Sequence, residues 1–81
     1  MRYDVRLFAL LKERVGQANW AFESEKALSG TELLTAFFDA HPQLDGLRRV
    51  TRLAVNQAFV SGNPTLAPGD ELALIPPVSG G

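Results

Sequence analysis

The sequence predicts a single α+β domain in which one main helix packs across one face of a mixed sheet. Three observations lead to this fold class. One segment has the 3.6-residue apolar period of an amphipathic helix, and several short segments alternate apolar and polar side chains as strands do. The 81-residue chain shows no internal repeat or linker, and a chain of this length forms one core.

The first part of the chain predicts two strands with a short helix between them. YDVRLFA (residues 3–9) alternates apolar and polar side chains, which is typical of a half-buried strand. LLKERVG (residues 10–16) predicts one or two helical turns that end at Gly16, because glycine commonly follows a helix C-terminus. NWAFES (residues 19–24) alternates again and predicts the second strand.

The main helix is predicted within LSGTELLTAFFDAHP (residues 28–42). Ser29 and Glu32 have the spacing of a capping box, and Pro42 ends the helix because it cannot continue the hydrogen-bond pattern. The predicted buried stripe follows helical spacing and consists of Leu34, Phe37, Phe38 and His41, flanked by Leu33 and Ala40.

The second half of the chain predicts three short strands after a turn at Asp45 and Gly46. TRLAVNQAFVSG (residues 51–62) contains two strands around a turn near residues 56–57. LAPGDELALI (residues 66–75) contains a Pro-Gly-Asp turn and the last strand. A strand hairpin, a helix and a returning strand are the order of the ubiquitin-like β-grasp fold, although segment order alone also allows a ferredoxin-like fold.

Composition and charge exclude several classes of protein. A hydrophobic fraction of 46% is too high for a disordered chain, and the absence of cysteine excludes disulfides, thiolate metal sites and a cysteine nucleophile. The charged N-terminus excludes a signal peptide, and no apolar run is long enough to span a bilayer. The net charge is −1, and the basic cluster of Arg48, Arg49 and Arg52 is interpreted as solvated. We therefore expect a cytoplasmic protein that binds neither nucleic acid nor membrane.

The side chains offer little catalytic chemistry. His41 is the only histidine and lies at a predicted helix C-terminus, where it caps the helix. One histidine without cysteine gives no ligand set for a transition metal, and the seven glycines form no phosphate-binding motif. Asp70 and Glu71 begin a strand, where pleating directs them to opposite faces. We expect the folded body to have no cofactor or metal and no catalytic activity alone.

The C-terminus is the unusual feature. We divide the chain into a folded domain at residues 1–75 and an extended tail at residues 76–81. Pro76 and Pro77 favour extended polyproline geometry, so the tail could project roughly 18–20 Å. Gly80 and Gly81 lack side chains and can enter a narrow channel. The terminal carboxylate is unreactive at neutral pH unless another enzyme activates it, for example by adenylation.

Several motifs together resemble one family over the whole chain. They are FALLKERVG after the first strand, TELL at the start of the main helix, AVNQAFV before the last strand, and GDELALIPPVSGG at the end. With these motifs in this order, the chain resembles the MoaD-type sulfur carriers, the small subunits of molybdopterin synthase.

The resemblance implies a ubiquitin-like β-grasp fold and a function in molybdenum cofactor biosynthesis. An ATP-dependent activating enzyme would adenylate Gly81, and sulfur would then replace an oxygen to form a thiocarboxylate. The tail would enter the active site of the large subunit and donate sulfur to the cyclic pyranopterin precursor. The residues that would thread this site are Pro76, Pro77, Val78, Ser79, Gly80 and Gly81. The family also suggests a heterotetramer of two small and two large subunits.

Strand parity predicts a docking surface. If Val5 and Leu7 face the core, Phe8 faces away from it, and the same alternation applies in the last strand. In the AFV segment, Ala58 and Val60 would face inward and leave Phe59 outward. An apolar patch on the helix-free sheet face would then consist of Phe8, Phe59 and Ile75. Contiguous apolar patches often mark interfaces, so we expect this patch to dock the large subunit and the activating enzyme in turn.

Other functions use the same diglycine terminus. A related carrier could deliver sulfur for thiamin synthesis or for tRNA thiolation. A ubiquitin-like modifier would instead join Gly81 to lysine side chains. A plain binding domain would use the apolar patch and not the tail.

Overall fold

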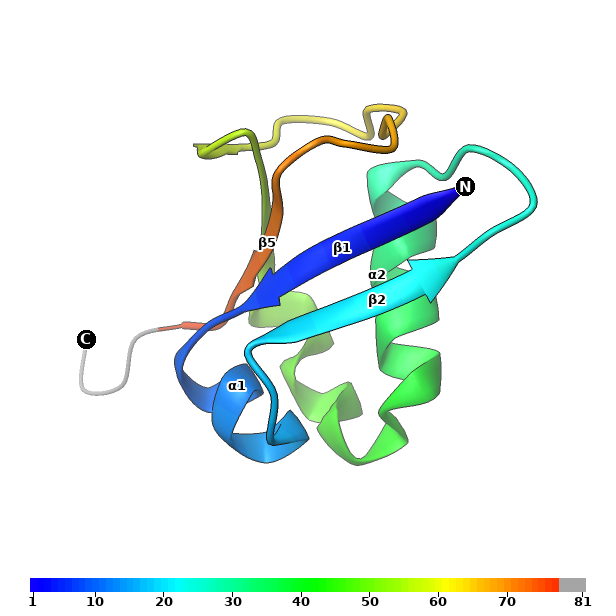
Figure 1. Ribbon diagram of the computed structural model, residues 1–81. Coiled ribbons are helices and arrows are strands. Elements are labelled where there is room, and N and C mark those ends of the chain that lie inside the picture. The colour runs from blue at the N-terminus through cyan, green and yellow to red at the C-terminus, as the bar shows by residue number, and fades with distance from the viewer. Residues whose placement is uncertain (78–81) are drawn as a thin grey trace.

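The fold is known from a computed structural model, which describes residues 1–77. In chain order its elements are β1 (Arg2–Leu7), α1 (Ala9–Val15), β2 (Asn19–Glu23), α2 (Gly30–Ala40), the 3-10 helix η1 (Pro42–Val50), β3 (Arg52–Val55), β4 (Ala58–Phe59) and β5 (Leu72–Ile75). The strands form one sheet in the order β2-β1-β5-β3-β4. Only the β1–β5 pair among these is parallel, so the sheet is mixed. Helix α2 lies across one face, which confirms the predicted α+β class (Figure 1).

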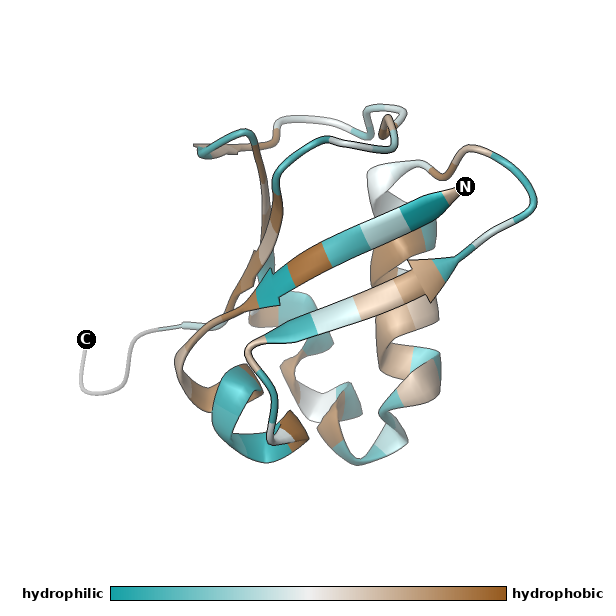
Figure 2. Ribbon diagram, viewed as in Figure 1, coloured by the Kyte–Doolittle hydropathy of each residue, from teal (hydrophilic) through white to brown (hydrophobic). Residues whose placement is uncertain are grey.

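The core lies between this sheet and α2. In β1, Tyr3, Val5 and Leu7 are buried and alternate with exposed polar residues. The parallel register places Val5 beside Leu72, and Leu7 beside Leu74, so the two central strands direct apolar side chains to the same side. Figure 2 shows this alternation along β1. The predicted parity of β1 and β5 is confirmed.

The predicted capping box of α2 is confirmed. The Ser29 hydroxyl accepts a hydrogen bond from the Glu32 amide at 3.2 Å, and the Glu32 carboxylate accepts one from the Ser29 amide at 2.9 Å. Lys26 donates to the same carboxylate at 2.8 Å. These bonds, the one from Lys26 foremost, lower the pKa of Glu32 below its usual value. Two partners thus favour the ionised form at the helix N-terminus.

The buried stripe of α2 is rotated from the predicted one. Its buried members are Gly30, Leu33, Phe37 and Phe38, while Leu34 and His41 are half-buried and Ala40 is exposed. The stripe therefore buries Leu33 fully and Leu34 only in part. His41 lies where expected, and its Nδ1 is 2.8 Å from the Phe37 carbonyl oxygen.

The segment after α2 differs from the prediction. A simple turn was expected at Asp45 and Gly46, but these residues belong to the nine-residue helix η1. Arg48 donates a hydrogen bond to the Thr35 hydroxyl and ties η1 to α2. The Thr51 hydroxyl donates to the Leu47 carbonyl at 2.7 Å and closes the C-terminal end. No helix within residues 1–77 is long and apolar enough to cross a lipid bilayer.

Tyr3 joins three distant segments inside the core. Its side chain is 1% exposed. The hydroxyl donates to the Leu66 carbonyl at 3.0 Å and accepts from the Leu28 amide at 3.0 Å. Leu66 and Leu28 are also bonded to each other through their backbones at 2.7 Å. One phenol thus fixes the segment before α2 against the loop that leads to β5.

We predict that Tyr3→Phe lowers the free energy of unfolding by about 1–3 kcal/mol, because the substitution leaves a buried amide and a buried carbonyl without their side-chain partner. Chemical denaturation monitored by Trp20 fluorescence measures the change. An unchanged free energy of unfolding would show that the phenol contributes volume and not hydrogen bonds.

Candidate functional site

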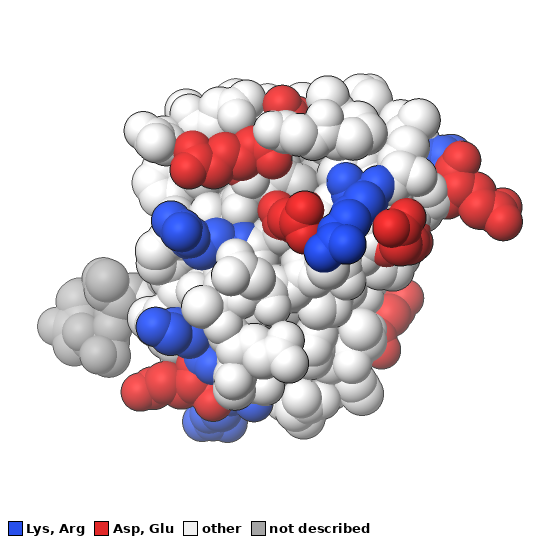
Figure 3. All heavy atoms as spheres, viewed as in Figure 1, with Lys and Arg blue, Asp and Glu red and all other residues white. Residues whose placement is uncertain are grey.

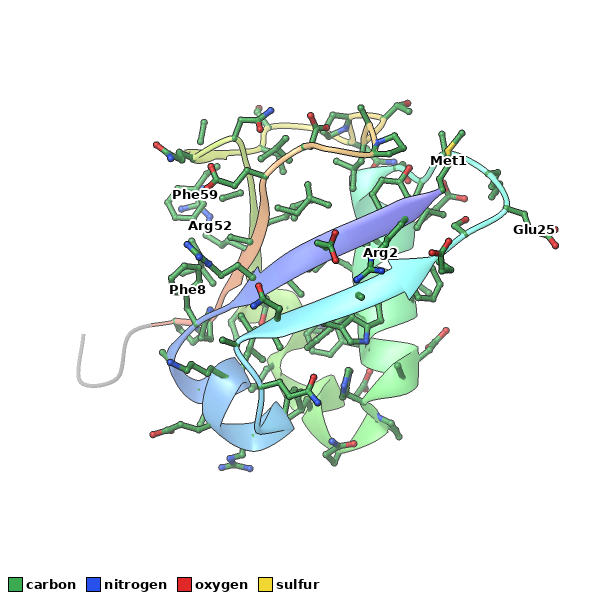
Figure 4. The ribbon with its side chains drawn as sticks, viewed as in Figure 1. Met1, Arg2, Phe8, Glu25, Arg52 and Phe59 are labelled. Atoms are coloured by element: carbon green, nitrogen blue, oxygen red, sulfur yellow. The ribbon has the colours of Figure 1, made fainter. Side chains whose placement is uncertain are left out.

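The three outward apolar residues lie around one hollow on the helix-free face of the sheet. This apolar hollow is lined by Arg6, Phe8, Ala54, Gln57, Phe59, Glu71, Leu72, Ala73 and Ile75. Phe8 and Phe59 are 41% and 49% exposed, which is unusual for large aromatic side chains, and Ile75 is half-buried. Figure 4 shows Phe8 and Phe59 projecting on the same side of the molecule. The structure therefore brings together all three residues of the predicted docking patch.

Phe8 is positioned by the junction of β1 and α1. Its backbone is extended, with φ −123° and ψ 155°, so its side chain continues the outward face of β1. Ala9 then adopts a left-handed φ of 47° and turns the chain into α1. The Phe8 carbonyl accepts the first helical hydrogen bonds, from the amides of Leu11 and Lys12 at 3.1 and 3.4 Å. The end of a strand and the start of a helix thus hold Phe8 between them.

Phe59 is positioned by β4 and covered on one ring face by Arg52. Phe59 lies opposite Ala54 in the antiparallel register, and Arg52 lies two residues earlier on the same face of β3. The Arg52 guanidinium carbon is 3.8 Å from the centroid of the Phe59 ring, which is cation–π geometry (Figure 4). Arg52 was interpreted as solvated. The side chain is indeed exposed, but it also stacks on the patch.

Ala58 lies opposite Val55, on the core side of the sheet as predicted. It is nevertheless exposed, because β4 is a two-residue edge strand. Val60, which is also predicted to face inward, is half-buried against the core.

Polar residues surround the apolar hollow. Arg6, Gln57 and Glu71 line it beside the aromatic rings, and we call these three residues its rim. The rim thus combines a guanidinium, a carboxamide and a carboxylate. Basic and acidic side chains are interspersed on this face, with basic ones on the side where β5 ends (Figure 3). An apolar centre with a polar rim is the usual composition of a protein–protein interface.

A side-chain network fixes the β3–β4 hairpin against the start of β5. The Asn56 amide donates to the Glu71 carbonyl at 2.8 Å, and the Glu71 amide donates to the Asn56 Oδ1 at 2.9 Å. Asn56 Nδ2 also donates to the Asp70 carboxylate at 3.3 Å. The second oxygen of Asp70 accepts from the Ala67 amide at 2.8 Å, as expected of a turn residue. The β3–β4 hairpin and β5, which line the hollow together with β1, are therefore held in one fixed relation.

The chain leaves the sheet beside this hollow. Strand β5 ends at Ile75, which lines the hollow, and its Cα pairs with that of Arg52. Pro76 is buried, whereas Pro77 is exposed, so the chain emerges from the folded body at Pro77. The remaining predicted tail residues, Val78, Ser79, Gly80 and Gly81, lie outside the described residues. The apolar hollow and the exit of the chain are neighbours on one side of the domain.

Several similar structures have been solved. The crystal structure of SAMP1 from Haloferax volcanii is 31% identical, covers all of both chains and superimposes with a TM-score of 0.81. A complex of subunits 1 and 2 of the molybdopterin-converting factor from Helicobacter pylori contains a chain that is 29% identical over the full length of both chains, with a TM-score of 0.69. These likenesses confirm the ubiquitin-like β-grasp fold.

Sequence comparison identifies the family. The molybdopterin synthase sulfur carrier subunit of Chlamydomonas reinhardtii is 36% identical over 83 residues, and the match covers the whole of both chains. The model of the ThiS family matches residues 5–81, which include the sheet except for the first three residues of β1, the hollow and the C-terminal motif. These matches confirm the resemblance seen in the sequence motifs, and the chain belongs to the ThiS family.

Proposed function

We propose that this chain is the sulfur carrier subunit of a molybdopterin synthase. The supporting observation is the full-length similarity to a protein of that name, together with a C-terminus that ends in Gly80 and Gly81. The apolar hollow lies beside the point where the chain leaves the sheet, and this position fits the function. A surface that holds the partner near Ile75 directs the tail toward the partner's active site.

In this proposal the reactive group is the terminal carboxyl of Gly81. An activating enzyme of the ATP-dependent adenylating class forms an acyl-adenylate and releases pyrophosphate. Hydrosulfide supplied by a donor then attacks the carbonyl carbon, AMP leaves, and loss of the proton on sulfur gives a thiocarboxylate. Because the chain has no cysteine, its own side chains provide no thiol to hold the sulfur. ATP is consumed by the activating enzyme in the cytoplasm, and the chain itself holds no cofactor.

The large subunit supplies the active site for sulfur transfer. The solved complex of subunits 1 and 2 from Helicobacter pylori supports a partner of this kind. We propose that the apolar hollow contacts the large subunit while residues 76–81 thread toward its active site. The activating enzyme would use the same hollow at a different time, since both partners must receive the same terminus.

A second function has support from one observation. The chain is also similar to SAMP1, and a second structure of 29% identity is described as the small archaeal modifier protein 1 of Haloferax volcanii. A modifier would transfer the activated Gly81 acyl group to a lysine amine and form an isopeptide bond. Carriers for thiamin synthesis or tRNA thiolation would share the thiocarboxylate and differ in the acceptor of the sulfur.

The proposed sulfur carrier function predicts a chemical change at the C-terminus. Incubation with ATP, a sulfur donor and the cognate activating enzyme should raise the intact mass by the difference between one sulfur and one oxygen atom. The added mass should disappear on oxidation, and a variant without Gly81 should show none. Addition of the large subunit and the pyranopterin precursor should restore the original mass as molybdopterin forms. An unchanged mass with a demonstrably active enzyme would contradict the carrier function. Isopeptide-linked products instead would favour the modifier.

The proposed docking at the apolar hollow predicts weaker binding when its aromatic side chains are replaced. Phe8→Asp and Phe59→Asp should each raise the dissociation constant for the large subunit by more than about tenfold, because they place a carboxylate in an apolar contact. Both side chains are already substantially exposed, so the variants should still fold. Calorimetric titration measures the affinity, and circular dichroism checks the fold.

Ala21→Asp is the matched control for docking. Ala21 is exposed and lies opposite Asp4 in the β1–β2 pair, on the same helix-free face but away from the hollow. The Ala21→Asp substitution adds the same charge to this face and should leave the affinity for the large subunit unchanged. Equal affinity of the wild-type chain and both phenylalanine variants would show that the partner docks elsewhere.

A further inference from the structure

The turn between β3 and β4 contains an unusual residue. Its two residues, Asn56 and Gln57, have φ angles of 52° and 72°. With both angles positive, the two-residue hairpin is of type I′, which requires a left-handed backbone at both positions and ordinarily has glycine at the second. Asparagine tolerates this conformation well, whereas a longer side chain is strained there. The chain therefore keeps a glutamine where the local backbone favours glycine.

The fold accounts for Asn56 but not for Gln57. Both side-chain atoms of the Asn56 amide make hydrogen bonds, with the Asp70 carboxylate and the Glu71 amide. By contrast, no hydrogen bond among residues 1–77 uses the Gln57 carboxamide. Gln57 is instead one of the residues that line the apolar hollow, together with Phe59. Strained residues tend to persist at functional sites. Gln57 is strained, makes no side-chain hydrogen bond within residues 1–77 and lines the predicted interface. We therefore expect it to contact the partner.

The chemistry of the rim indicates what Gln57 would contact. Arg6 can only donate hydrogen bonds and an ionised Glu71 can only accept them, whereas a carboxamide does both. A peptide group also has one donor and one acceptor, so the carboxamide of Gln57 matches it. A partner segment that places an apolar side chain between Phe8 and Phe59 would bring its own backbone to the rim. A backbone group buried there needs a hydrogen-bond partner.

We infer that Gln57 is a specificity-determining residue of the docking surface. Its carboxamide exchanges hydrogen bonds with a peptide group of the large-subunit segment whose apolar side chain fills the hollow. This inference rests on the proposed function, because the large subunit is the partner. The left-handed turn, fixed by Asn56, holds Gln57 at the rim before the partner arrives.

Two substitutions in the full-length chain test this role. Gln57→Gly relieves the backbone strain and removes the carboxamide. Gln57→Met keeps the length of the side chain and its backbone conformation but removes both hydrogen-bonding groups. Gln43→Ala, at an exposed glutamine on η1 that does not line the hollow, is the control. The measurements are the dissociation constant for the large subunit and the midpoint of urea denaturation.

Gln57→Gly should raise the denaturation midpoint and also raise the dissociation constant by on the order of tenfold. Gln57→Met should raise the dissociation constant similarly with little change in the midpoint. A purely structural role would not combine higher stability with weaker binding. Wild-type affinity in either variant, or a lower midpoint in Gln57→Gly, would overturn the inference. A wild-type chain that does not bind the large subunit would overturn the proposed function together with this contact.

Discussion

The parallel pairing of β1 with β5 is the constraint on which the rest of the structure depends. It joins the start of the chain to its end in the middle of the sheet, and it fixes which side chains face which way. Val5, Leu7, Leu72 and Leu74 face α2 and form the centre of the core. The same alternation sends Arg6 and Ala73 to the opposite face, where they line the hollow. A shift of one residue would exchange the two sets and remove both core and hollow.

The pairing also determines where the terminus leaves the domain. Strand β5 runs parallel to β1 and ends beside Phe8, the residue that follows β1. On the other side of β5, Arg52 pairs with Ile75 and stacks on Phe59. The last residue of the sheet is therefore surrounded by the exposed aromatic side chains. A partner that covers these side chains necessarily comes close to the residue from which the tail departs.

Residues with local signals could be predicted from the sequence. The α2 capping box depends on Ser29 and Glu32, three residues apart, and the outward positions of Phe8 and Ile75 follow from alternation within single strands. Such patterns involve only neighbours along the chain. The resemblance in the C-terminal motifs supplied the family, which alternation alone could not.

Features that depend on packing or on strand register could not be predicted. The fuller burial of Leu33 than of Leu34 depends on how α2 rotates against the sheet. Helix η1 is stabilised in part by contacts from Arg48 and Thr51, which no apolar period reveals. The stacking of Arg52 on Phe59 requires the β3–β4 register. A turn near residues 56–57 was expected, but the strain at Gln57 follows only from a loop of two residues.

The central claim is that the helix-free face docks the partner and thereby aims the terminus. Cross-saturation NMR tests it most directly, with the isotope-labelled chain bound to the unlabelled large subunit. The account predicts that signal loss concentrates on amides around the hollow, including those of Phe8, Gln57 and Phe59, and that the exposed residues of α2, such as Glu32 and Asp39, are unaffected. Signal loss on α2 and η1 with no change around the hollow would contradict it.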